Sequence, residues 1–231
     1  MSVILPTATS FLEALSDEER KKLLSLARKI VLRPGETVDR PELDADTVGL
    51  VDTGAFIERL YYGARTVPIV RIAGSSELLQ THHLFVSTRF YRCELRAIHI
   101  ENNSLLLWPV EVFLEALKAN PETMLYLCHF FSHQAHLGHR NLYEAVAHSA
   151  YFRLVNLLVG LANQFGYLNA NGSEVLLPLK LTIKDLSECI NVSRETGSNL
   201  FNKLRRKGVI APGKFIKVEL SRLSEYAATL E

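Results

Sequence analysis

Cysteine is scarce in this sequence of 231 residues. The three cysteines, Cys93, Cys128 and Cys189, lie far apart along the chain. This spacing excludes a disulfide framework and a zinc site of the C-x-x-C type, and an iron-sulfur cluster would need about four clustered cysteines. We therefore expect neither structural disulfides nor an iron-sulfur cofactor, and a reducing compartment suits the chain.

Long apolar runs are also missing. None reaches the roughly 18 residues that a transmembrane helix needs. The N-terminus has no basic stretch ahead of an apolar segment, so we expect no secretory signal, no membrane partner and a cytoplasmic location. With 48% hydrophobic and 22% charged residues, the composition is that of a globular protein and excludes collagen-like or disordered classes.

Charge is distributed unevenly although the whole chain carries a formal charge of only +1. Residues 1–148 have a net charge of −3, and residues 149–231 have a net charge of +4. Seven basic residues between Ser193 and Lys217 face a single acidic one, Glu195. All eight histidines lie before residue 149. This asymmetry indicates two parts with different chemistry, the second of them suited to a polyanion.

The N-terminal half has the pattern of a β-rich domain. Ser16 and Glu19 form a capping-box pair, and apolar residues at helical spacing predict a first helix that continues through Ile30. From residue 34 to about residue 108, short runs rich in Val, Ile and aromatic residues alternate with Gly and Pro. This pattern predicts a sandwich or barrel of short strands.

A long helix follows this domain. Asn120 and Pro121 supply a cap and a first helical residue, and nothing breaks the helix before about residue 148. Along it, residues recur at alternating steps of four and three, as in the seam between two paired helices. We interpret this seam as a dimer interface, with packing of the helix on its own barrel as the alternative. The seam residues are Met124, Cys128, Phe131, Ala135, Gly138, Leu142 and Ala145. The predicted domains are 1–120, 121–148 and 149–231.

The C-terminal part has the signals of a winged helix-turn-helix. Thr182 and Asp185 form a second capping box ahead of a short helix, and Asn191 suits the left-handed backbone of a tight turn. Ser193 caps the next helix, expected over 194–207 and ended by Gly208. Residues 209–218 have the pattern of a small hairpin, the wing.

The second of these helices has one apolar and one polar face. In a major groove, arginine matches guanine, glutamate accepts from cytosine and asparagine pairs with adenine. The expected base-contacting residues are Arg194, Glu195, Ser198 and Asn199. Contacts to phosphates are expected from Thr182, Ser193, Lys203, Arg205, Arg206 and Lys214. The alternative is a charged helical face that is merely solvated.

The stretch from Asp185 to Thr196, continuing to Leu204 and Gly208, closely resembles the DNA-binding signature of the Crp/Fnr family. Residues 33–36 and 46–54 and the long helix are similar to the rest of the family's outline. The resemblance implies an α+β fold with an N-terminal cyclic-nucleotide-binding-like β-barrel (a double-stranded β-helix), a long dimerisation helix and a winged helix-turn-helix. It also implies a bacterial homodimeric transcription regulator that reads a palindromic operator in double-stranded DNA, and contacts RNA polymerase if it is an activator.

The sequence departs from the family at several positions. Asn199 stands where the family commonly has arginine, and Gly197 replaces an apolar residue at a cost of about 1 kcal/mol of helix stability. In the sensor half, the family resemblance assigns Glu77, Arg89 and Tyr91 to the effector pocket. Ser76 replaces a glycine that approaches phosphate, so we expect no cyclic AMP binding of the usual kind.

Several histidines are candidate ligands for a haem or a metal ion. His129 and His133 stand one helical turn apart, and His82 and His83 are adjacent, so haem or metal ligation is an alternative to a site without metal. Two other classes compete with a regulator. One is a cupin-like metal-binding enzyme that uses His82, His83, Glu94 and His99, and the other is an interaction module with a degenerate DNA domain. We expect no enzymatic activity, and the effector remains unidentified.

Overall fold

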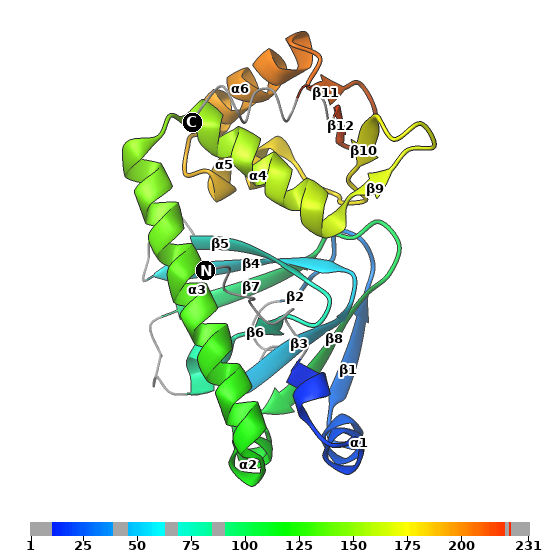
Figure 1. Ribbon diagram of the computed structural model, residues 1–231, viewed down its shortest axis with the longest axis vertical. Coiled ribbons are helices and arrows are strands. Elements are labelled where there is room, and N and C mark those ends of the chain that lie inside the picture. Colours follow the sequence, from blue (N-terminus) through cyan, green and yellow to red (C-terminus); the bar gives the residue numbers. More distant parts are fainter. Residues whose placement is uncertain (1–10, 39–45, 63–68, 85–90, 220–221, 223–231) are drawn as a thin grey trace, which may run out of the picture.

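The computed structural model describes residues 11–38, 46–62, 69–84, 91–219 and 222. An N-terminal β-rich domain occupies one end of the molecule and a smaller helical domain the other, with one long helix running along the side of the first (Figure 1). This arrangement confirms the expected α+β order of a β-rich domain, a long helix and a helix-turn-helix.

The chain enters the β-domain through two short helical segments, η1 (Phe11–Ala14) and α1 (Asp17–Ser25). The capping box at Ser16 is present, with its N–H 2.9 Å from the Glu19 carboxylate. The expectation that this helix continues through Ile30 is wrong. Leu26 is already the C-cap, and Ile30 lies in strand β1 (Arg28–Leu32), opposite Leu105. Pairing with a neighbouring strand decides the conformation here over the local apolar spacing.

The described strands of the β-domain form two antiparallel four-stranded sheets. The first has the order β1-β8-β3-β6 and the second the order β2-β7-β4-β5. Their apolar side chains meet in a core that includes Val51, Phe56, Leu79, Leu95 and Leu105. The remaining strands are β2 (Thr37–Val38), β3 (Thr47–Thr53), β4 (Ala55–Tyr62), β5 (Ile69–Gly74), β6 (Leu78–Leu79), β7 (Tyr91–Ala97) and β8 (Asn103–Pro109), with a short helical turn η2 (Thr81–Leu84) after β6.

Two helices close the domain. Helix α2 (Val110–Ala119) has no counterpart among the sequence expectations, and its Phe113 packs beside Trp108. Helix α3 (Pro121–Ala147) begins as predicted, with the Asn120 side chain accepting a hydrogen bond from the Glu122 N–H at 2.9 Å. Neither these helices nor the others in the described part of the chain combine the length and apolar character needed to cross a bilayer.

One stripe of residues on helix α3 packs against the β-domain of the same chain. Thr123 and Leu127 are buried, and Phe130, Gln134 and Leu137 are half-buried. The adjacent stripe, which is the predicted seam, is left largely uncovered. Among its residues only Phe131 is half-buried, and the exposed ones are Met124, Cys128, Ala135, Gly138, Leu142 and Ala145. Cys128 is exposed in the single chain because its own domain does not cover this stripe.

The C-terminal domain begins with helix α4 (Ala150–Phe165), capped by Ser149. Strands β9 (Tyr167–Leu168), β10 (Glu174–Leu176), β11 (Ile210–Ala211) and β12 (Lys217–Glu219) make a small sheet, and helices α5 (Ile183–Cys189) and α6 (Arg194–Arg206) complete the domain. Strand β10 ends at Leu176. Beyond it, residues 178–180 pair with residues 98–100, where the Lys180 N–H donates to the Ile98 carbonyl at 2.6 Å.

Candidate functional site

The first helix of the helix-turn-helix is fixed by its capping box. The Thr182 N–H and hydroxyl lie 2.6 and 2.8 Å from the Asp185 carboxylate, and the Asp185 N–H donates back to the hydroxyl at 3.2 Å. Both members of the predicted box are therefore present. Burial opposes ionisation of Asp185, but hydrogen bonds from Thr182 and the charge of Arg96 bring its pKa below the usual value.

The turn and the second helix also have the predicted local chemistry. Asn191 takes a positive φ of 54°, and the Val192 N–H closes the turn on the Ser187 carbonyl at 3.0 Å. The Ser193 hydroxyl accepts from the Thr196 N–H at 3.1 Å and so caps α6. Gly208 has a φ of 69° just beyond the helix, as a C′ glycine does. The sequence therefore sets both the angle and the ends of α6.

Gly197 has a packing role that the sequence did not reveal. Its buried backbone lies against α5, where an added Cβ would be 2.0 Å from the Ser187 hydroxyl and 3.0 Å from the Ser187 Cβ. The expectation that this glycine only weakens the helix is incomplete, because its missing side chain lets α5 and α6 approach closely.

The four expected base-contacting residues lie on the open side of α6. Arg194, Glu195 and Asn199 are exposed, and Ser198 is half-buried. The opposite side is packed, with Phe201 and Leu204 in the core shared by the domain. In Figure 1 the helix lies at the end of the molecule remote from the two sheets.

The wing lies beside this face. Strands β11 and β12 pair as a hairpin, and residues 212–214 form its tip. A hollow of about 670 Å³ lies between the wing, α5 and α6, and Pro34 and Ile100 of the β-domain also line it. Thr182, Ser198, Arg205 and Lys214 all border it, so the structure brings together four of the expected nucleic-acid contacts.

The other basic residues differ in their surroundings. Arg206 is exposed at the last turn of α6. The Lys203 ammonium lies 4.8 Å from the centroid of the Tyr151 ring on α4, and the Arg205 guanidinium lies 5.1 Å from the Phe201 ring. Lys203 therefore also holds α6 against α4, a contribution that charge counting alone did not suggest.

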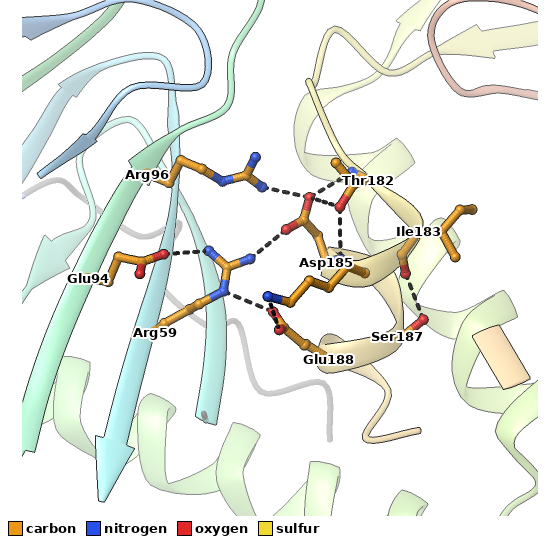
Figure 2. A network of polar contacts seen from close by, with 9 residues as sticks. Arg59, Glu94, Arg96, Thr182, Ile183, Asp185, Ser187 and Glu188 are labelled. Atoms are coloured by element: carbon orange, nitrogen blue, oxygen red, sulfur yellow. Dashed lines mark hydrogen bonds and ion pairs between the residues drawn. The ribbon is translucent and has the colours of Figure 1, made fainter. Parts of the chain in front are cut away.

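An ion-pair network joins α5 to the β-domain (Figure 2). Arg59 of β4 contacts Asp185 at 2.5 Å, Glu188 at 2.9 Å and Glu94 of β7 at 3.1 Å. Arg96 of β7 contacts the second Asp185 oxygen at 2.6 Å. The Arg59 and Asp185 side chains are only 5% and 3% exposed, so this is an interior network.

No pattern in the sequence points to Arg59 or Arg96 as members of a site. Arg59 and Asp185 are 126 positions apart, and no local pattern connects them. The available signal was weak: two adjacent charged residues, Glu58 and Arg59, in the middle of a strand whose residues 55–57 are all buried. Arg153 of α4 was missed for the same reason. It donates to the His148 carbonyl at 2.9 Å and to the Ile190 carbonyl at 3.1 Å, tying the end of α3 to the end of α5.

A second polar cluster lies in the β-domain around Glu77. Its carboxylate accepts from the Gly74 N–H at 2.7 Å, and burial raises the pKa of Glu77 against the nearby charge of Arg71. Arg71 pairs with Glu58 at 3.1 Å, and Glu58 also accepts from the Gln80 N–H. Of the other expected effector-pocket residues, Arg89 lies outside the described residues, and Tyr91 is the first residue of β7.

The candidate metal and haem ligands are distributed over separate elements. His82 and His83 lie on η2 with ring centroids 4.1 Å apart, and burial lowers the pKa of His82. His129 and His133 are exposed on α3. Within the described ranges, no three or more His, Cys, Asp or Glu side chains are grouped so that they could hold a metal ion. Haem ligation by these residues stays a prediction.

Comparison with known proteins adds to the geometry. Residues 152–226 match the family described as the Crp-like helix-turn-helix domain. The global nitrogen regulator of Nostoc sp. is 32% identical over 126 residues, which are 54% of this chain and 53% of that protein. The chain thus matches about half the length of this curated relative.

Solved structures resemble nearly the whole chain. A CooA mutant from Carboxydothermus hydrogenoformans has a TM-score of 0.68 at 21% identity, covering 96% of this chain and 97% of its own. The c-di-GMP responsive global regulator CLP from Xanthomonas campestris has a TM-score of 0.71 at 17% identity, covering 88% and 99%. At these identities the likeness shows a common fold.

Proposed function

We propose that this chain, which has the Crp-like helix-turn-helix domain and the overall fold of the Crp/Fnr family, is a dimeric transcription regulator that binds double-stranded DNA through α6. The observation that carries the proposal is the reading face of α6. It is exposed, correctly capped, and bordered by a basic wing across an open hollow.

The residues on this face match the chemistry of base recognition. Arg194 offers two parallel donors for a guanine, Glu195 accepts from a cytosine, and Asn199 pairs with an adenine. Ser198 adds a hydroxyl at the border of the hollow. The basic residues around the hollow neutralise phosphates, and they give affinity that falls as salt rises. Thr182 and Ser193 are placed at helix N-termini, where phosphate oxygens are readily bound.

The uncovered stripe of α3 supports a homodimer. Leu142 is 65% exposed and Val146, beside the seam, is 82% exposed. Apolar side chains so open on a 27-residue helix are typical of a surface that a second helix covers. A symmetric dimer requires two half-sites about one helical turn apart, and hence a palindromic operator.

An effector or a redox signal would act on the β-domain, an effector at the pocket of Glu77, Arg89 and Tyr91, and its effect would reach DNA through the packing of α3 and α4. The chain would act in the cytoplasm as a binding protein without catalytic activity, and it would contact RNA polymerase if it is an activator.

Selection from a random duplex pool tests the function. The full chain, without added ligand and at near-physiological salt, is expected to enrich a palindromic sequence. The matched control is the same selection with an Arg194→Ala, Asn199→Ala double variant, which keeps the capping residues and loses two readers. Failure of the wild-type chain to enrich any sequence, in the absence and presence of haem or nucleotides, would favour an interaction module with a degenerate DNA domain.

A further inference from the structure

The helix-turn-helix and the β-domain of one chain meet at more than the peptide that links them. Residues 178–180 pair by backbone hydrogen bonds with residues 98–100. Apolar side chains from both parts, including Ile57, Ile98 and Leu186, belong to one core. Such a contact buries surface but has little directional preference, because hydrophobic burial is nearly independent of orientation.

The ion pairs of Arg59, unlike the apolar contacts, depend on the relative orientation of the two domains. A guanidinium is planar and presents its donors at fixed angles. Three carboxylates, from Glu94, Asp185 and Glu188, surround the Arg59 guanidinium, and two of them belong to α5. The backbone pairing at 178–180 is one attachment, and the Lys180 ammonium adds a hydrogen bond to the Pro34 carbonyl at 3.0 Å. The Arg59 contacts are a further attachment on a different element, α5, so they restrict rotation of the domain about the 178–180 segment.

The network is balanced in charge but not built for stability. Arg59, Arg96 and Lys184 face the three carboxylates, with Lys184 3.6 Å from Glu188. Buried ion pairs of this kind contribute little net stability compared with apolar side chains of the same volume, whereas they can specify one arrangement among several.

The arrangement held in this way leaves the reading face open. While Asp185 and Glu188 contact the β-domain, Arg194, Glu195 and Asn199 on α6 remain exposed. Figure 1 places α5 between the sheets and α6. A contact that occluded DNA would instead turn these residues toward the sheets.

We infer that Arg59 is a positioning residue for DNA recognition, which sets the orientation of α5, and through it of α6, on the sensor domain of its own chain. This inference rests on the proposed function. It assigns to β4 a part in DNA binding although no residue of β4 touches the nucleic acid.

The strand that carries Arg59 also reaches the sensor interior. Side chains alternate between the two faces of a strand. Arg59 contacts α5, and the preceding residue, Glu58, is 5% exposed and contacts Arg71 and Gln80 in the polar cluster near Glu77. A rearrangement of that cluster would therefore move the strand that holds the helix-turn-helix.

A cycle of variants in the full chain tests the role of Arg59, with the affinity for the selected operator as the readout. Arg59→Met is expected to weaken binding about tenfold, within the range of about 5–150-fold that is usual for coupling between sites. Glu188→Met is expected to weaken it as well, and the double variant should bind no worse than the weaker single variant. Arg59→Lys should recover part of the loss, because lysine can hold one of the carboxylates.

Controls separate positioning from folding. Lys29→Met removes an ion pair with Asp52 inside the β-domain and should leave the affinity unchanged. Thermal unfolding of each variant shows whether the chain is folded at the temperature of the binding assay. If Arg59→Met does not fold, the comparison of Glu188→Met with Lys29→Met carries the test, since Glu188 lies at the edge of the network with a side-chain exposure of 16%.

The outcomes are distinct. Unchanged operator affinity in folded Arg59→Met and Glu188→Met, or additive losses in the double variant, would overturn the positioning role. Tighter binding would also overturn it, because the contact would then hold the domain away from DNA. A wild-type chain that selects no duplex refutes the proposed function itself, and the role of Arg59 with it.

Discussion

Gly197 of α6 and Ser187 of α5 lie so close that a Cβ added to the glycine would be 2.0 Å from the serine hydroxyl. Ser187 in turn donates to the Ile183 carbonyl at 2.6 Å, so its hydroxyl is already engaged. The crossing of the two helices therefore depends on a small residue at each position. A glycine that appeared unfavourable for the reading helix is required by the packing between helices.

Gly197→Ala should lower the free energy of unfolding. Overpacking costs about 1–3 kcal/mol, and the gain in helix propensity is about 1 kcal/mol, so the net loss is expected to be about 1 kcal/mol. Chemical denaturation of the two chains measures it. In a Ser187→Gly background the same change should become neutral or stabilising, because the clash is removed. An equal loss in both backgrounds would contradict the contact.

Arg194→Ala and Lys214→Ala should differ in kind. Loss of Arg194 removes a bidentate base contact, so specific binding should weaken by about 1–3 kcal/mol and the preference at one guanine should relax. Loss of Lys214 removes a phosphate contact, so all sequences should weaken alike and the salt dependence should decrease by about one unit of slope. Titration of operator and scrambled duplexes at several salt concentrations checks both. Identical behaviour of the two variants would contradict these roles.

Leu142→Glu should dissociate the dimer. The side chain lies on the uncovered stripe of α3, and a carboxylate placed there would be buried opposite its copy. Sedimentation velocity measures the change in mass. His136→Glu is the matched control, since His136 is exposed on the same helix outside the seam. A Leu142→Glu chain that stays dimeric would place the interface elsewhere.

Cysteine reactivity gives an independent test of the same surface. Burial raises the pKa of Cys189 to about 12 and raises that of Cys93 further, so neither should react with a thiol reagent at pH 8 while the chain is folded. Cys128 is exposed in the single chain and lies in the seam. Colorimetric labelling should therefore show one fast thiol in the Leu142→Glu variant and none in the wild-type dimer. A second fast thiol in the variant would contradict the burial of Cys93 or Cys189.

Glu77→Gln should stabilise the β-domain at neutral pH. Burial raises the folded-state pKa of Glu77 above its usual 4.5, so the protonated form is favoured in the fold. The contribution of the Glu77 carboxyl to the free energy of unfolding is fully present below its pKa in the unfolded chain. It is lost as the pH rises through its pKa in the folded chain. Thermal unfolding of wild type and variant should coincide near pH 4 and diverge toward pH 7, with the variant higher. A constant difference at all pH values would contradict the shift.

The local parts of the fold were predictable from the sequence, because short-range chemistry determines them. Thr182 and Asp185 form their box, and Asn191 and Gly208 take positive φ, since each position depends on residues within a few places along the chain. The predicted first helix extends too far, because apolar spacing through Ile30 suits a helix. In the structure, pairing of Ile30 with Leu105 makes that segment a strand. The residues around Ile30 do not show that this segment will pair with β8.

The long-range parts of the site were not predictable. Arg59 and Asp185 come from different domains, and a single sequence carries no mark of their contact. Gly197 was judged by helix propensity alone, although Ser187 on another helix explains it. The proposed base-contacting face could be predicted because its residues repeat at helical spacing within one element. Which DNA sequence it prefers depends on a partner that neither the spacing nor the fold contains.

Trp108 is the chain's single tryptophan, and it is fully buried in the β-domain with its indole N–H donating to the Leu23 carbonyl at 2.8 Å. Its emission therefore describes the sensor half alone. A small molecule that alters this fluorescence must act on the sensor half, directly or from a distance. A duplex bound at α6 has no tryptophan nearby to quench. Any change in the emission spectrum upon adding DNA would therefore report, without a label, a conformational change transmitted from α6 to the surroundings of Trp108.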